Sequence, residues 1–295
     1  MESDYDKISD ITEFIKKVKE INDSCERNKS ETNEVLYFRG HANTEYQLTP
    51  SLARMEMDFI CQTERALVEI SINEIPRLFN KDMTPLNLLS CMQHYGIPTR
   101  LLDITKNPLV ALYFACENEA NKDGVVYVFK NNETIDNIGN YPIDNAIADI
   151  YKIALTDFVP VIDFFDFVIK QSYFSSQKYI IETKNDDEKI EYVKKNSSVP
   201  RIVSAPYFFE RQFMQKGSYI LFPNVIEREN IINEIVELKE SDGMIVKKLI
   251  INKDSKKKIL NDLNLFGIST GALFKDSADK RCADIIKRFK SDYEK

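Results

Sequence analysis

Residues 99–129, TRLLDITKNPLVALYFACENEANKDGVVYVF, decide the fold of this chain. Residues 99–102 predict a short buried strand. Asn107 and Pro108 combine an N-cap residue with proline at the first helical position, so we expect a helix to begin there. Residues 124–129 are the clearest strand of the sequence, because they are rich in β-branched and aromatic side chains. The stretch therefore predicts a unit of strand, polar turn, helix and strand.

Polar side chains gather at the ends of the apolar runs in and before this unit. The chain has only two histidines, and they fall in the motif-like segments 37–41 and 93–103. The polar residues near them, each at the end of an apolar run, are Arg39, Arg100, Asp103, Thr105 and Asn107. We place Asp103 and Thr105 in the turn between the strand and the helix. This clustering indicates a concave site rather than a scatter of surface residues.

The N-terminal part predicts a helix followed by a strand. Asp10 and Glu13 form a capping box that opens an amphipathic helix. We expect residues 1–29 to act as a helical brace against the core. Residues 35–38 predict a strand that stops at Arg39, which places this arginine at the mouth of the strand.

Two helices are expected before the central unit. The first covers residues 63–78. Thr84 and Pro85 supply an N-cap and a first-turn proline for the second, and Gly96 supplies its C-terminal stop. His94 therefore lies in the last turn of that helix.

The second half of the sequence is more heterogeneous. Residues 131–200 predict a helical insertion, and the charged residues 182–195 within it predict a solvated helix end or a mobile linker. A helix carrying Glu210 and Gln215 precedes a glycine stop. The remaining expected elements are strands at residues 218–222 and 244–251 and helices at residues 254–265 and 276–295.

Composition limits the class of protein. The 295 residues are 43% hydrophobic, enough to bury a sizeable core, and the formal charge of −7 argues against a broad surface for nucleic acid. The sequence predicts no membrane span and no signal peptide, so a cytoplasmic location is expected. The five cysteines are widely spaced without a CxxC pair, which favours reduced thiols over disulfides or a metal site.

Several motifs together resemble the FRG domain, a family named for its Phe-Arg-Gly signature. The resemblance is carried by residues 37–41, 48–52, 93–103, 107–115 and 211–217. It implies a domain over residues 30–275. Ile104 departs from the pattern, since the family usually has tryptophan there, and so does the segment 273–276, which replaces a Phe-Pro-Asp ending. The family is often found in bacterial and phage-linked proteins, and the resemblance implies a domain without naming its reaction.

The order of the parts is similar to that of ADP-ribosyltransferases. That likeness implies an α+β fold with a core of small mixed or antiparallel sheets flanked by helices. It also implies NAD as the substrate and a protein or nucleic acid as the acceptor. A bacterial toxin or phage-defence effector of this kind would be paired with an antitoxin or regulatory partner, with no membrane involved.

The same likeness assigns roles to individual residues. Arg39 would bind the NAD phosphates or ribose, Asp103 and Thr105 would support the nicotinamide pocket, and Glu210 or Gln215 would stabilise the transition state.

The chemistry of the residue types suits these roles. A carboxylate stabilises the positive charge that develops on the ribose by several kcal/mol. Gly40 would let the backbone approach the diphosphate, His41 would hydrogen-bond a ribose hydroxyl, and His94 would act as an acid, base or phosphate donor. The catalytic candidates are Arg39, His94, Asp103, Glu210 and Gln215. The cofactor-binding candidates are Phe38, Arg39, Gly40, His41, Tyr95, Arg100, Thr105 and Asn107, and no metal ligands are expected.

Other interpretations remain open at this point. Arg39 and Asp103 could form a buried structural bridge, Arg100 could anchor a strand end, and either histidine could belong to the core. Residues 256–258, three lysines, are interpreted as a solvated helix face. At the level of function, the alternatives to an ADP-ribosyltransferase are a metal-independent nuclease and a nucleotide- or RNA-binding module without catalysis.

Overall fold

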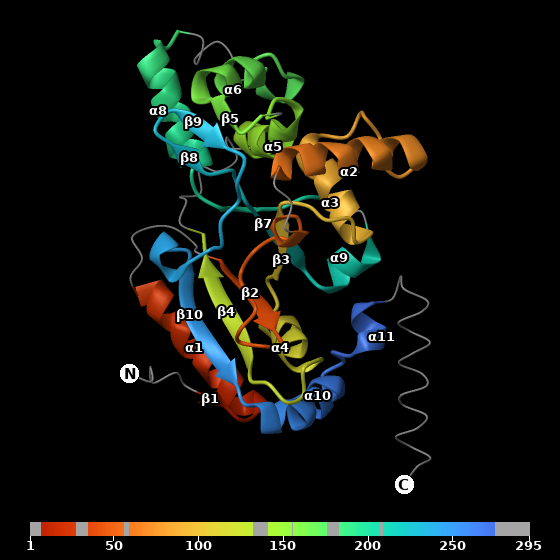
Figure 1. Cartoon of the computed structure of the whole chain (residues 1–295). Helices are drawn as coiled ribbons and strands as arrows, with labels where there is room; N and C mark the ends of the chain where they lie inside the picture. Colours follow the sequence, from red (N-terminus) through yellow and green to blue (C-terminus); the bar gives the residue numbers. More distant parts are fainter. Residues whose placement is uncertain are drawn as a thin grey trace.

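The computed structural model describes residues 7–27, 35–55, 59–131, 141–154, 156–175, 183–206 and 209–274. These residues form an α+β structure in which helices cover a mixed sheet (Figure 1). The α+β class predicted from the sequence is therefore confirmed. The C-terminal helix expected at residues 276–295 lies outside the described residues.

A seven-stranded sheet organises the structure, in the order β1-β10-β4-β2-β3-β7-β6. β1 runs parallel to β10, and the other neighbouring strands are antiparallel. The strands are β1 (Lys7–Ile8), β10 (Ile245–Ile251), β4 (Gly124–Lys130), β2 (Leu36–His41), β3 (Leu101–Thr105), β7 (Gly217–Leu221) and β6 (Arg201–Val203).

The sheet opens in its middle, between β2 and β3. β2 pairs with β4 along its whole length, and β3 pairs with β7 along its whole length. Between β2 and β3 the pairing consists of the single step Phe38↔Thr105. Beyond this point the residues that follow Phe38 and those that precede Thr105 no longer pair, so backbone groups and side chains of both strands border a gap.

Both central strands are longer than the sequence pattern predicts. β2 continues through Arg39 and Gly40 to His41, because these residues pair with Tyr127, Val126 and Val125 of β4. β3 likewise includes Asp103 and Thr105, which were expected in a turn. Cross-strand pairing with neighbours distant in sequence overrides the weak strand propensity of arginine, glycine and aspartate.

Helix α4 (Pro108–Cys116) lies directly on β2 and β4, and two glycines make this possible. A Cβ atom at Gly40 would come within 1.9 Å of the Ala111 carbonyl oxygen, and one at Gly124 within 2.2 Å of the Ala115 carbonyl oxygen. Gly40 therefore serves close packing of helix on sheet. The expectation that Gly40 lets a diphosphate approach the backbone did not include this packing role.

Helices cover the rest of the fold. α1 (Ile11–Arg27) begins at the predicted capping box, in which the Glu13 amide donates to Asp10 Oδ1 (2.9 Å). α1, α4 and α10 (Lys256–Leu265) contribute to the core on one face of the sheet. The other helices of the core region are α2 (Ile60–Glu74), α3 (Pro85–His94), α9 (Glu210–Met214) and α11 (Thr270–Leu273).

Helices and a small second sheet form a separate lobe next to the part of the main sheet that contains β3 and β7 (Figure 1). It contains α5 (Tyr141–Asp149), α6 (Val161–Val168), α8 (Asp186–Ser197) and a three-stranded sheet of β5 (Phe158–Pro160), β9 (Asn230–Ile232) and β8 (Ile226–Glu227). Most of the charged stretch, which was interpreted as a solvated helix end or a mobile linker, is helix α8, opened by a capping box of Asn185 and Glu188. Val193 and Ser197 are the buried residues of α8, so its charged side chains lie at or near the surface.

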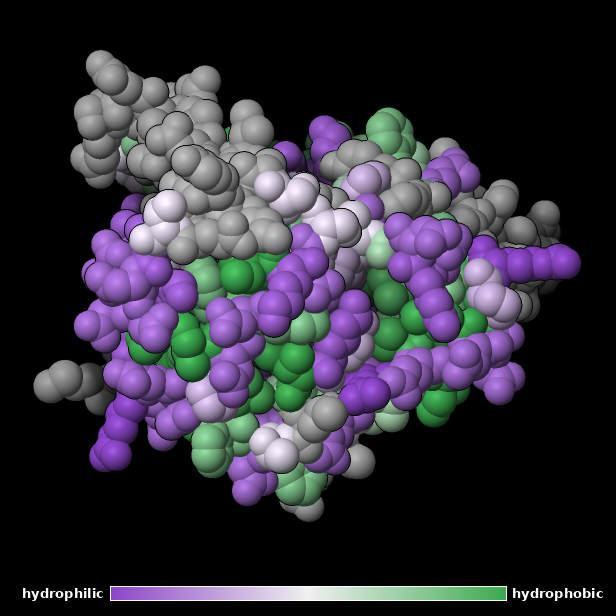
Figure 2. Space-filling model, turned by 90° about the horizontal axis from the view of Figure 1, so that it is seen from above, coloured by the Kyte–Doolittle hydropathy of each residue, from purple (hydrophilic) through white to green (hydrophobic). Residues whose placement is uncertain are grey.

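The outer surface is mixed in character. Seen from above, hydrophilic residues cover much of the molecule, and hydrophobic residues show between them in separate areas (Figure 2). Within the described ranges, no helix combines the length and apolar character that a membrane span needs.

Candidate functional site

A pocket with a volume of about 360 Å³ lies at the opening between β2 and β3. We call it the Arg39 pocket. It is bordered by the end of β2 and the loop after it, the end of α3, β3, α4, and the α9–β7 segment. The predicted site residues that line it are Phe38, Arg39, Gly40, His41, His94, Asp103, Thr105 and Gln215. The two histidine motifs therefore meet at one cavity.

Arg39 reaches across the opening in the sheet. Its Nη1 donates to the backbone carbonyl of Asp103 on β3 (2.5 Å), and its Nε donates to His41 Nε2 (2.7 Å). Among the ion pairs of the described residues, none joins Arg39 to the Asp103 carboxylate. The structural bridge considered from the sequence is thus replaced by a bond to the backbone, and both charged groups face the pocket.

The electrostatics keep Arg39 charged and His41 neutral. Burial lowers the pKa of Arg39 to about 10, although the Asp103 charge counteracts this, so Arg39 is a cation at pH 7. Burial, followed by the Arg39 charge, lowers the pKa of His41 to about 3. A neutral His41 can accept from Arg39 at Nε2 while Nδ1–H donates to the Tyr46 carbonyl (3.3 Å).

His41 therefore positions Arg39 instead of presenting a free ring nitrogen to a ligand. Both ring nitrogens are occupied, and the side chain is only 6% exposed. The expected bond from His41 to a ribose hydroxyl would require breaking one of these contacts. The ring also packs edge-on against Tyr127 (centroids 5.3 Å apart), which restrains it further.

Asp103 presents a carboxylate to the pocket. Gln93 Nε2 donates to Asp103 Oδ2 (2.9 Å), and Gln93 Oε1 accepts from the Thr99 hydroxyl (2.8 Å). These two bonds determine the amide orientation of Gln93, which in turn restrains the carboxylate. Asp103 is exposed, so a ligand can approach it.

The α9–β7 segment supplies further polar groups to the pocket. Arg211 lines it, with its guanidinium over the Phe274 ring (4.8 Å to the centroid). Gln212 is buried and donates to Ser90 and Tyr219. Gln215 lines the pocket, but its side chain donates to the Leu273 carbonyl (3.2 Å).

His94 lines the pocket at the C-terminal end of α3. Its ring stacks on Phe209, with centroids 3.7 Å apart and planes 2° from parallel. Tyr95 contacts both rings edge-on but is not part of the pocket lining. Stacking on Phe209 orients the His94 imidazole, which is the part of this aromatic group that lines the pocket.

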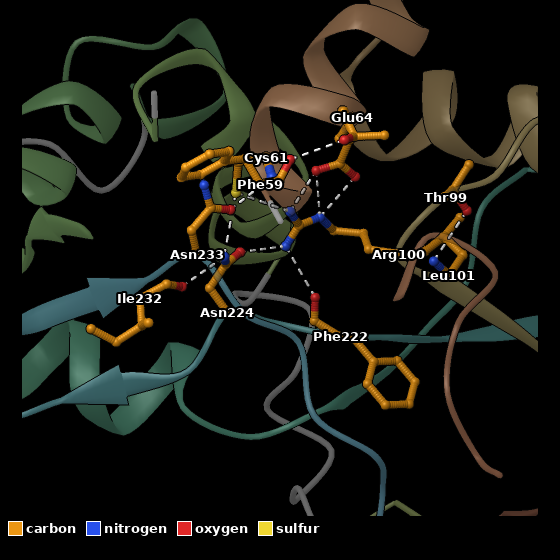
Figure 3. A network of polar contacts seen from close by, with 11 residues as sticks. Phe59, Cys61, Glu64, Thr99, Arg100, Leu101, Phe222, Asn224, Ile232 and Asn233 are labelled. Carbon is orange, nitrogen blue, oxygen red and sulfur yellow. Dashed lines mark hydrogen bonds and ion pairs between the residues drawn. The ribbon is translucent and has the colours of Figure 1, made fainter. Parts of the chain in front are cut away.

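Arg100 does not face the pocket. Its side chain is completely buried and donates to Glu64 through Nε and Nη2, and its Nη1 donates to the Phe222 carbonyl and to Asn224 Oδ1 (Figure 3). Cys61 lies against the same guanidinium. The assignment of Arg100 to cofactor binding does not hold, because the whole side chain is used to join β3 to α2 and to the segment after β7.

Thr105 and Asn107 serve the backbone. The Thr105 hydroxyl donates to the Gln215 carbonyl and accepts from the Asn107 amide (2.9 Å), and the Asn107 side chain caps α4 by accepting from the Leu109 amide (3.0 Å). Asn107 does not line the pocket. These contacts hold the β3–α4 turn against the α9–β7 turn, which is a structural role.

Glu210 is exposed on α9 and lies outside the pocket lining. Of the late acid or amide expected from the order of parts, Glu210 is therefore not part of this cavity, whereas Gln215 lines it. The carboxylate in the lining is that of Asp103. In the described residues no group of three or more metal-ligating side chains is found.

Sequence reasoning missed several lining residues. Gln93, Arg211, Gln212 and Tyr219 line the pocket and were not named as site residues. The first three lie within motifs quoted for the family resemblance, so the motifs themselves carried the signal. Tyr219 had no such signal, because within a strand pattern it reads as an ordinary core aromatic residue.

The fold and the cavity define a class: an α+β domain with a ligand-sized pocket where its sheet opens, bordered by two arginines and one carboxylate. Residues 34–124 match the family model of the FRG domain. The chain thus contains an FRG domain there, and the resemblance is confirmed for this segment.

The matched segment runs from the residues before β2 to the first residue of β4. It includes Arg39, His41, His94 and Asp103, while the α9–β7 side of the pocket lies beyond it. No curated protein and no solved structure matches the chain.

Proposed function

We propose that this chain is an NAD-dependent ADP-ribosyltransferase and that the Arg39 pocket binds NAD. One observation carries the proposal: the Arg39 guanidinium and the Asp103 carboxylate border the same open cavity of about 360 Å³. Small-molecule sites have volumes of roughly 300–1,000 Å³. The cavity is therefore suited to the nicotinamide and ribose half of a dinucleotide, with the remainder extending toward solvent.

Arg39 is suited to the diphosphate. A guanidinium has five N–H groups, and Arg39 uses two in its bonds to His41 and Asp103, which leaves three for an anion. The neutral His41 ring restrains the guanidinium before the ligand arrives, which lowers the entropic cost of binding. Arg211 adds a second cation to the lining.

Asp103 is suited to the reacting ribose. When the C1′–N bond breaks, both bonding electrons leave with nicotinamide and positive charge develops on the sugar, which a nearby carboxylate stabilises. The acceptor nucleophile then forms the new bond to C1′ and gives up a proton. His94 lines the same cavity and is the candidate base.

The test combines NAD binding with nicotinamide release. Wild-type protein should be stabilised thermally by NAD and should release nicotinamide on incubation. Arg39→Ala should lose the NAD-induced shift, and Asp103→Asn should keep it while nicotinamide release falls by roughly 100-fold or more. Arg65→Ala is the matched control, because Arg65 forms an exposed pair with Glu69 on α2 (2.7 Å).

The alternatives give different results in the same experiment. An NAD-induced shift without nicotinamide release would indicate a nucleotide-binding module. Cleavage of RNA in the absence of NAD would indicate a nuclease. If NAD neither stabilises the protein nor is consumed, the proposal is refuted.

A further inference from the structure

A buried hydrogen-bond network closes one side of the Arg39 pocket. It joins three side chains: Ser90 on α3, Gln212 on α9 and Tyr219 on β7. Gln212 Nε2 donates to Ser90 Oγ (3.1 Å) and to the Tyr219 phenolic oxygen (2.5 Å), and the two hydroxyl groups are 2.9 Å apart. Gln212 and Tyr219 line the pocket, whereas Ser90 is completely buried behind them.

A count of donors and acceptors shows that one hydroxyl hydrogen has no acceptor within this network. Ser90 and Tyr219 each accept from Gln212, and one of them donates to the other. The hydroxyl that receives this bond still has its own hydrogen. If that hydroxyl were Ser90, a donor would be buried with no acceptor, which costs about 1–3 kcal/mol. If it is Tyr219, the hydrogen faces the pocket, where a ligand or water can accept it.

We infer that Ser90 donates to Tyr219 and that Tyr219 donates its phenolic hydrogen to a neutral carbonyl oxygen of the ligand. Two donors to its oxygen polarise the phenol and make it a better donor. Burial raises the pKa of Tyr219 to about 12, so the group keeps its proton at pH 7.

The surroundings of Tyr219 favour a neutral acceptor over an anion. Tyr219 and Asp103 are directly opposite each other on neighbouring strands, so their side chains share one face of the sheet. The Asp103 charge contributes to the raised pKa of Tyr219, which shows that the carboxylate acts on the phenol. A phosphate next to Tyr219 would be repelled by Asp103 more strongly than it would be attracted by Arg211, because the Asp103 charge has the larger effect on the phenol. An amide or ketone oxygen would not.

In the proposed NAD site the acceptor is the carboxamide oxygen of nicotinamide, an assignment that rests on the proposed function. Two pairs of probes test the Tyr219 hydrogen bond separately from the proposed NAD site. NAD and ADP-ribose differ by the nicotinamide group, and free nicotinamide and 3-methylpyridine differ by the carbonyl. Calorimetric titration of each into wild-type protein and Tyr219→Phe measures what the phenol contributes to each ligand.

We expect Tyr219→Phe to weaken NAD and nicotinamide binding by roughly fivefold to tenfold, the value of one neutral hydrogen bond. Binding of ADP-ribose and 3-methylpyridine should stay the same. An equal loss for all four probes, or no loss for any, would overturn the inference and leave the proposed function standing if wild-type protein still binds NAD.

Ser90→Ala gives an independent test and does not remove the phenol. With the inferred proton arrangement, Tyr219 already donates into the pocket, so nicotinamide binding should not become tighter. Tighter binding would mean that Tyr219 had donated to Ser90 and would overturn the inference. Wild-type protein that binds nicotinamide in preference to 3-methylpyridine, but neither NAD nor ADP-ribose, would retain the subsite and refute the proposed function. Binding of none of the four probes would overturn both.

Discussion

Removal of the Glu64 carboxylate should cost a large part of the stability of this protein. Glu64 accepts from Arg100 Nε through both of its oxygens (2.9 and 3.0 Å) and from Nη2, and the two side chains are 1% and 0% exposed. Glu64→Ala leaves the Arg100 charge buried without its counter-ion. Breaking a buried pair in this way costs about 3–5 kcal/mol, out of a typical total of about 5–15 kcal/mol.

Urea unfolding followed by circular dichroism at pH 7 measures this loss, provided that the slope of the transition is the same in wild type and variant. Arg65→Ala, one position along α2, is the control, because its exposed pair with Glu69 should contribute at most about 1 kcal/mol. A loss below about 1 kcal/mol for Glu64→Ala would refute the buried ion pair. So would a loss equal to that of the control.

Three other changes test the structure around the Arg39 pocket. The pKa of His41 is about 3 in the folded state and about 6.5 in the unfolded state. Wild-type stability should therefore fall as the pH decreases through this interval, by up to about 1.4 kcal/mol per pH unit, and His41→Gln should lack this pH dependence. Parallel stability curves for the two proteins, from urea unfolding at pH 4–7, would contradict this prediction. Gly40→Ala should lower stability by about 1–3 kcal/mol or more, because the new Cβ would lie 1.9 Å from a carbonyl oxygen. Gly217→Ala should be tolerated, because the nearest atom to its new Cβ is 3.6 Å away. Equal melting temperatures for the two variants would argue against the close packing of α4. Lys256→Met should destabilise the protein by about 2 kcal/mol or more, because the Lys256 ammonium donates to three backbone carbonyls. Lys257 is exposed, so Lys257→Met should change stability by less than about 0.5 kcal/mol. Similar shifts in melting temperature for both variants would count against the role of Lys256.

The helix boundaries show how far local sequence can predict this fold. Pro85 at the start of α3, Gly96 after it with a φ of 81°, and the Asn107 cap of α4 were all expected, because each depends on neighbours within a few residues. The lysines at residues 256–258 show the limit of such reasoning. They were interpreted as one solvated face, yet Lys256 is 2% exposed and binds the carbonyls of two loops at the pocket rim.

The candidate site shows the same division between what local sequence predicts and what it cannot predict. The sequence by itself determined that both histidines and a set of arginines and acids lie in motifs at the ends of apolar runs. It could not separate Arg39 from Arg100, since each lies directly beside such a run, Arg39 after residues 35–38 and Arg100 before Leu101 and Leu102. Only the tertiary structure decided that one guanidinium borders an open cavity while the other is buried against Glu64. The reason is physical: the role of a guanidinium depends on the hydrogen-bond acceptors around it, and those acceptors come from segments far away in the chain.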